Sequence, residues 1–155
     1  IEEINGNFYK ARLVWTNVGW RPTTQDTFPL LGKTSIDNFF IATGTKRDGF
    51  HLSPVISDYM TKIMMGETVD ERFDWFAPER PLIRELSREE AIEMAVGSLM
   101  SEQYQHGYRP SCVPMNNQVR ETYRKDLEEL HDRVGATDWG IPPLMVNMYR
   151  YGYAQ

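Results

Sequence analysis

The residues of this chain best suited to chemistry surround two glycines that follow a short apolar run. Gly44 and Gly49 flank a polar loop, and the Ser53-Pro54 pair after it has the composition of a helix start. The first N–H groups of a helix are unpaired and carry a partial positive charge, so they attract anions and electron-rich carbonyls. Glycines also let the backbone lie close to a flat ligand. The pattern predicts either a ligand-binding loop or an ordinary strand-to-helix turn.

Two arginines near this loop could bind a carboxylate. Arg21 follows a β-rich run, and Arg47 lies within the glycine loop beside Lys46. A guanidinium can bind a carboxylate through two parallel hydrogen bonds. Surface or structural arginines are the commoner case, so the sequence alone leaves both interpretations of Arg21 and Arg47 open.

The histidines give no indication of a metal site. His51, His106 and His131 are scattered, and none has a cysteine or carboxylate at the spacing of a metal ligand. We therefore expect no bound metal. His51 stands two residues before Ser53, where it could face a ligand or act as a hydrogen-bonded structural histidine.

Two other catalytic motifs are excluded. Gly32-Lys33-Thr34 matches the end of a phosphate-binding loop, but Thr27 occupies the position of that motif's first glycine. The sequence contains no Gly-x-Ser-x-Gly, so it predicts no hydrolase triad. We interpret the single cysteine, Cys112, as a small, partly buried hydrophobic residue and not as a catalytic thiol.

Composition limits the class of protein. The 155 residues, 41% hydrophobic and 25% charged, predict one folded globular domain. The net charge is −5 and no run of Lys and Arg occurs, so we expect no nucleic-acid partner. No apolar stretch approaches the roughly 18 residues that cross a bilayer, so we expect no membrane partner and favour a cytoplasmic location. Because the chain begins with Ile1, we expect a processed chain, a fragment or an incomplete record.

The elements around the loop follow from local patterns. Partial alternation predicts a strand over residues 8–18, followed by an ordered loop over 19–38. The apolar run at 39–43 predicts a strand covered on both faces, as in a parallel sheet. An apolar stripe then predicts a helix that begins at Ser53 and ends at Gly66. Strand, loop and helix in this order form half of a βαβ unit.

The rest of the chain is predicted to be helical. Ser87 and Glu90 form a capping box, which predicts the start of a second helix. A loop is expected over 104–116 and a third helix over 117–134, with Gly135 as its stop. The aromatic residues of the C-terminal tail are typical of core or interface packing.

Three spaced patterns within residues 12–67 resemble a known signature. They are Arg21-Pro22-x-Thr24-x-Asp26-x-x-Pro29-x-Leu31-Gly32, then Ala42-Thr43-Gly44, then Arg47-x-Gly49-x-x-Leu52-Ser53-Pro54. Together they resemble the C-terminal signature of the D-amino-acid oxidase superfamily. Its members are flavoprotein amine oxidases and dehydrogenases, and they include glycine, sarcosine and D-amino-acid oxidases.

The resemblance implies a FAD cofactor and hydride transfer from a C–N bond of a small amine or amino-acid substrate to flavin N5. It implies that Arg21 binds the substrate carboxylate, that Arg47 lies near the flavin ring, and that the helix start near Ser53 faces the flavin N1/C2 carbonyl. The implied cofactor-binding residues are Gly44, Thr45, Asp48, Gly49, Phe50, His51, Leu52 and Ser53.

Two departures from the family pattern affect the functional interpretation. The retained Arg21, Gly44 and Gly49 favour the leading interpretation, the C-terminal portion or subunit of a FAD-dependent oxidoreductase. Thr45 stands where many members have a histidine, which favours the alternative, a non-catalytic interaction subunit that retains the fold. The Gly-x-Gly-x-x-Gly motif that binds the FAD pyrophosphate is absent, so we expect a second polypeptide to carry it. A standalone small-molecule-binding domain is a further alternative.

The resemblance also implies the organisation of the chain. The expected fold class is α/β, in the form of an α+β fragment that closes a FAD-binding Rossmann-like domain. Residues 1–38 would end a substrate-domain sheet and its loop. Residues 39–67 would form the closing strand, loop and helix of the FAD-binding domain, and residues 68–155 a helical C-terminal extension.

Overall fold

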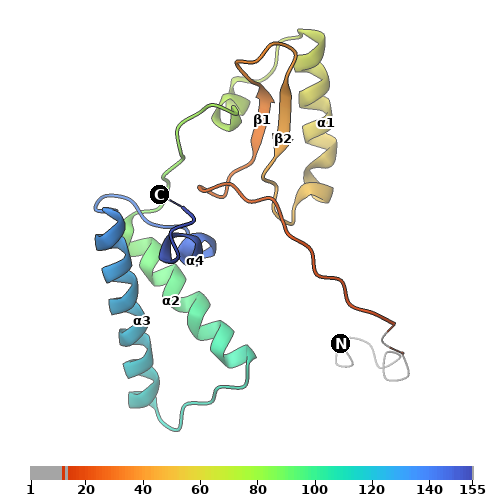
Figure 1. The fold of residues 1–155 in the computed structure, drawn as a ribbon. Helices are drawn as coiled ribbons and strands as arrows, with labels where there is room; N and C mark the ends of the chain where they lie inside the picture. The colour runs from red at the N-terminus through yellow and green to blue at the C-terminus, as the bar shows by residue number, and fades with distance from the viewer. Residues whose placement is uncertain (1–11, 13, 155) are drawn as a thin grey trace.

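The computed structural model describes residue 12 and residues 14–154, and it has a first lobe of mixed α and β structure and a second, helical lobe (Figure 1). The first lobe contains β1 (Leu30–Lys33), β2 (Phe40–Thr43), α1 (Gly49–Met65) and the 3-10 helix η2 (Glu71–Phe76). The second contains α2 (Arg88–Gln105), α3 (Val113–Val134), the 3-10 helix η3 (Pro143–Met145) and α4 (Val146–Arg150). Among the described residues, no helix combines the length and apolar character that a bilayer crossing requires.

The sheet is a two-stranded antiparallel hairpin. Leu31 pairs with Ala42, and the turn between the strands closes through a hydrogen bond from the Thr34 N–H to the Phe39 carbonyl (3.0 Å). The predicted long loop is therefore wrong at β1, which forms because this short turn folds it back onto β2. The expected parallel pairing is also wrong for the described residues, since their one sheet contains only β1 and β2. β2 is not covered on both faces, because Ala42 is exposed.

The predicted strand over residues 8–18 falls partly on residues 8–11 and 13, which lie outside the described part of the chain. The remainder is an extended segment that runs away from both lobes (Figure 1). Its apolar side chains are exposed, from 73% for Trp15 to 101% for Val18. A strand needs a neighbour for its backbone hydrogen bonds, and the described sheet does not extend to this segment.

The helix α1 packs on the hairpin. Tyr59 is its buried side chain, and the Tyr59 ring stacks on Phe73 of η2 with centroids 4.2 Å apart. The helix ends at Gly66, whose left-handed conformation (φ 73°) confirms the predicted stop. The other end of α1 differs from the prediction and belongs to the site described below.

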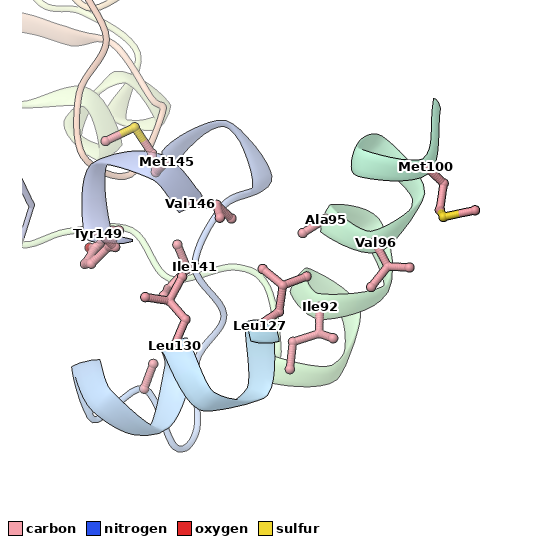
Figure 2. Packing of buried hydrophobic residues seen from close by; sticks show 11 residues of the cluster. Ile92, Ala95, Val96, Met100, Leu127, Leu130, Ile141, Met145, Val146 and Tyr149 are labelled. Atoms are coloured by element: carbon pink, nitrogen blue, oxygen red, sulfur yellow. The ribbon is translucent and has the colours of Figure 1, made fainter. Parts of the chain in front are cut away.

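The second lobe holds the main core, between α2, α3 and the C-terminal segment (Figure 2). The predicted capping box at the start of α2 is confirmed, because Ser87 accepts from the Glu90 N–H and Glu90 accepts from the Ser87 N–H (3.0 Å). The buried cluster consists of Ile92, Ala95, Val96, Met100, Leu127, Leu130, Ala136, Ile141, Met145, Val146 and Tyr149. The C-terminal tail therefore supplies part of this core.

The helix α3 begins earlier than predicted. It starts at Val113, with Pro114 in its first turn, and the predicted loop over 104–116 is correspondingly shorter. Proline marks a loop in most sequence contexts, but the first helical turn tolerates it because the N–H groups there lack acceptors anyway. The predicted stop at Gly135 is confirmed by its left-handed conformation (φ 75°).

A fully buried histidine connects α3 to the tail. The Ile141 N–H donates to His131 Nε2 (3.0 Å), so His131 Nδ1 carries the ring proton and donates to the Leu127 carbonyl (2.8 Å). Burial lowers the pKa of His131 most strongly, the bond to Leu127 opposes this, and the charge of Arg88 lowers it further. His131 is therefore a neutral structural residue of the core.

We expect the free energy of unfolding to fall as the pH decreases from about 7.5 to about 5.5. The unfolded chain protonates His131 near the ordinary pKa of about 6.5, whereas the folded state resists protonation. The unfolded state thus binds more protons, and His131 contributes a loss of at most about 1.4 kcal/mol per pH unit below that pKa. Urea midpoints followed by circular dichroism at several pH values measure it. His131→Gln should flatten the profile, whereas the exposed control His106→Gln should preserve it; a flat profile for the unmodified protein would contradict this prediction.

A buried ion pair anchors the loop before β1. Asp26 is 4% exposed and accepts hydrogen bonds from the Arg80 guanidinium, the Phe28 N–H (3.0 Å) and the Ile83 N–H (2.9 Å). Burial by itself raises the pKa of Asp26, but the three donors outweigh it, and the pKa is lowered overall. The loop that carries the first part of the family signature is thereby tied to the segment between the two lobes.

Candidate functional site

The glycine loop is held against the loop that precedes β1. Gly44 is buried at the end of β2 with φ 80°, and a Cβ there would lie 2.7 Å from Thr24 Cγ2 and 3.3 Å from Pro29 Cα. Glycine is required at this position for both reasons. The close neighbours of Gly44 are residues of the chain itself, and its contact with a cofactor stays a prediction.

A backbone hydrogen bond brings the Arg21 segment to the glycine loop. The Lys46 N–H donates to the Pro22 carbonyl (3.1 Å), and Lys46 takes the left-handed conformation (φ 50°) that aims this N–H back along the chain. As a result, Arg21 and Arg47 line one hollow of about 490 Å³, here named the arginine hollow. Its other lining residues are Thr23, Lys46, Asp48, Leu144, Met145 and Met148.

The arginine hollow has an excess of positive charge. Arg21, Lys46 and Arg47 contribute three cations, and Asp48 contributes one carboxylate. In the described part of the chain, no ion pair or side-chain hydrogen bond engages any of the three cationic groups. Unpaired cations gathered around a hollow are suited to bind an anion.

The helix α1 begins at Gly49, upstream of the predicted start at Ser53. Pro54 lies inside the helix and has no N–H for the Phe50 carbonyl, and the Ser53 hydroxyl donates to that carbonyl instead (2.8 Å). The predicted capping role of Ser53 is therefore wrong. A Ser-Pro pair has the composition of a helix start, but here the serine compensates for the missing proline donor within the helix. The N-cap is Asp48, whose side chain makes no capping hydrogen bond.

The first turn of α1 presents both donors and apolar surface. The N–H groups of Gly49, Phe50 and His51 belong to this turn, and such groups have no acceptor within a helix. Phe50 is 88% exposed and Leu52 38% exposed. The rings of Phe50 and His51 meet edge to face, with centroids 6.1 Å apart. This surface can accept a flat, partly apolar group that carries a carbonyl oxygen.

A second hollow of about 460 Å³, here named the helix hollow, lies beside the same turn. It is lined by Ala42, Thr45, Gly49, Ser53, Ile56, Ser57 and Met60. At Gly49 a Cβ would lie 2.9 Å from Thr45 Oγ1, so a side chain there would displace Thr45. Thr45 occupies the position where the resembled family often has a histidine, and it contributes a hydroxyl to this hollow.

The structure thus separates the predicted site residues into groups that share a surface. The arginine hollow contains Arg21, Arg47 and Asp48. The helix hollow contains Thr45, Gly49 and Ser53. The exposed first turn carries Phe50, His51 and Leu52, and Gly44 lies buried behind the loop. All ten residues belong to the loop and helix start or to the segment bonded to it.

Sequence reasoning missed the residues that complete the arginine hollow from the C-terminal segment. Leu144, Met145 and Met148 follow the prolines of the tail, and no motif relates them to Arg21. Only the packing of the two lobes brings them together. Among residue 12 and residues 14–154, no group of three or more His, Cys, Asp or Glu side chains is arranged to hold a metal ion.

Comparison with known proteins gives one local similarity. No family model matches the chain. A segment of 62 residues, 40% of the chain, is 32% identical to the "Bifunctional protein ThiO/ThiG" of Synechocystis sp.. The match covers 10% of that protein, so the chain spans about a tenth of the length of the curated relative it matches.

Proposed function

We propose that this chain forms one side of the flavin site of a FAD-dependent oxidoreductase that acts on the C–N bond of a small amine or amino acid. The observation that carries the proposal is the exposed first turn of α1, which follows β2 and the glycine loop in the order of the family signature. The local similarity to a ThiO/ThiG protein supports a link to flavoenzymes.

The residues of the first turn fit a flavin ring on one side. The free N–H groups of Gly49, Phe50 and His51 suit an electron-rich ring carbonyl, and the helix dipole favours negative charge there. Phe50 and Leu52 offer exposed apolar surface to a flat ring. When bound, FAD supplies the acceptor for the substrate hydride.

The role of the chain's own residues follows from the arginine hollow. The Arg21 and Arg47 guanidinium groups bind and orient a substrate carboxylate, since neither has an ion-pair partner in the described residues. The hollow adjoins the glycine loop, because Arg47 and Asp48 belong to both. Orientation of the substrate at this loop is therefore the contribution we assign to these two arginines.

The proposal includes a second polypeptide that carries the Gly-x-Gly-x-x-Gly half of the site. The sequence lacks this motif, and several large apolar side chains of the described residues are uncovered. Trp15, Val18 and Trp20 are 73–102% exposed, and Phe50 and Val55 on α1 are 88% and 53% exposed. Burial of such side chains against a partner would stabilise an assembly.

The absorbance spectrum of the protein, purified with any polypeptide that accompanies it, tests the proposal. We expect bound flavin that an amine or amino acid reduces, together with a second polypeptide in the intact mass. Phe50→Ser should weaken FAD binding about tenfold, because it removes apolar contact with the ring. Val113→Ser changes an apolar residue of α3 that is also largely exposed, at 72%; it is the control and should leave FAD binding unchanged.

Two outcomes would count against the proposal. A colourless protein that does not bind added FAD would contradict it entirely. A bound flavin that no amine or amino acid reduces would instead favour the non-catalytic interaction subunit, which the replacement of a family histidine by Thr45 also favours.

A further inference from the structure

The arginine hollow has an apolar side that comes from the other lobe. Leu144 and Met145 belong to η3 and Met148 to α4, in the C-terminal segment that the family resemblance does not cover. Leu144 is 68% exposed and Met148 46% exposed, whereas Met145 is 6% exposed and anchors this side in the core. Three unpaired cations and an exposed apolar surface therefore face the same space.

The apolar side is held firmly in place. Tyr149 is 4% exposed, and its hydroxyl accepts a hydrogen bond from Gln25 Nε2 (2.8 Å), which ties α4 to the loop before β1. Arg150 pairs with Asp126 of α3 (2.5 Å). The Met145 N–H donates to the Pro142 carbonyl (2.8 Å) and closes η3. Leu144 and Met148 thus project from a segment fixed at both ends.

We infer that the arginine hollow binds a carboxylate that carries an apolar tail, and that Leu144 and Met148 determine the preference for that tail. The cations of Arg21, Lys46 and Arg47 bind the carboxylate, and the exposed leucine and methionine contact the adjoining apolar group. This inference rests on the proposed function where it concerns the reaction: the substrates are then amino acids with an apolar side chain. Leu144 and Met148 are specificity-determining residues in that case.

Binding of n-hexanoate, acetate and n-hexylamine tests the inference without any need for turnover. The full-length protein, with its flavin and any accompanying polypeptide, is labelled at the methionine methyl groups and titrated by NMR. Each buried methylene strengthens binding up to about fourfold, so we expect hexanoate to bind at least about tenfold more tightly than acetate. Hexylamine has the same tail and the opposite charge, and it should not bind. The Met148 methyl resonance should shift with hexanoate.

Substitutions test the apolar side and the cationic side of the arginine hollow independently. Leu144→Asn and Met148→Gln should reduce hexanoate binding to the level of acetate and leave acetate binding unchanged. Arg21→Ala should weaken both ligands about tenfold or more, since it removes a charged hydrogen-bonding partner. Met64→Gln, a methionine of α1 that is 55% exposed, and Lys125→Ala of α3 are the matched controls and should change neither.

Several results would overturn the inference: no binding of hexanoate, equal binding of acetate and hexanoate, or unchanged hexanoate binding in both Leu144→Asn and Met148→Gln. Leu144 and Met148 are exposed, and the methyl resonance of the buried Met145 reports that each variant is folded. A colourless protein that still prefers hexanoate would contradict the proposed function and support this site. If substrates reduce the flavin but hexanoate and acetate bind equally, the proposed function is supported and this inference is contradicted.

Discussion

Gly140→Ala is expected to destabilise the helical lobe by about 3 kcal/mol, as severe overpacking does in other cores. A Cβ at Gly140 would lie 2.2 Å from Ala91 Cβ and 2.5 Å from the Ser87 carbonyl oxygen. Neither neighbour can rotate away, because one is the short side chain of a buried helix residue and the other is backbone. The tail would have to separate from the start of α2 and lose the hydrogen bond from the Gly140 N–H to the Leu86 carbonyl (2.8 Å).

Gly97→Ala is the matched control for this variant. Gly97 lies inside α2, and a Cβ there would have no neighbour within 4 Å. It should stabilise the helix by about 0.5–1 kcal/mol, because alanine loses less backbone entropy than glycine in a helix. Urea unfolding measures both variants. If Gly140→Ala is as stable as Gly97→Ala, the tail does not lie as close to α2 at Gly140 as described here. The hexanoate preference should also be lost in Gly140→Ala, since the same tail carries Leu144.

Asp26→Asn should cost about 3–5 kcal/mol of stability, which is the usual effect of removing one partner of a buried ion pair. The variant leaves the Arg80 side chain, 7% exposed, without its counter-charge. The amide also keeps one acceptor in place of the two carboxylate oxygens that bind Arg80 and the backbone N–H groups of Phe28 and Ile83. Because the pKa of Asp26 is lowered in the folded state, the contribution of this pair is present above the unfolded pKa of about 4 and is lost as the pH falls below it.

Asp70→Asn is the matched control for the ion pair. Asp70 bonds Arg72 within the same turn, but the Arg72 side chain is 86% exposed, so solvent screens the interaction. Chemical unfolding should show a far smaller loss for Asp70→Asn than for Asp26→Asn. Equal losses would mean that the loop before β1 is not anchored by Asp26. In Asp26→Asn we also expect weaker carboxylate binding, because this loop positions Arg21.

Local patterns predicted the features that neighbouring residues control. The capping box at Ser87 and Glu90 and the helix stops at Gly66 and Gly135 are confirmed, since each depends on hydrogen bonds or backbone angles within a few residues. Prolines were misleading at both wrongly placed helix starts. Pro114 was predicted to lie in a loop, but it lies in the first turn of α3. Pro54 was predicted to lie in the first turn of α1, but it lies further inside that helix.

The sheet could not be predicted from the same patterns. β1 and β2 are each four residues long, and the partner of a short strand depends on which other strand reaches it. Here the turn at residues 34–39 selects the antiparallel partner, against the parallel pairing that the apolar run suggested. The exposed Ala42 of β2 agrees with this outcome, because antiparallel sheets commonly leave one face to solvent.

The sequence by itself determined the residue types of the site: a glycine loop, a helix start beside it, and two arginines able to bind a carboxylate. Only the tertiary structure decided which of them share a surface. The backbone bond from Lys46 to Pro22 places Arg21 beside Arg47, and the buried core of the second lobe carries Leu144 to the same hollow. These contacts join segments far apart in the chain, and they depend on burial and on hydrogen bonds such as the one from Gln25 to Tyr149, which no local spacing encodes.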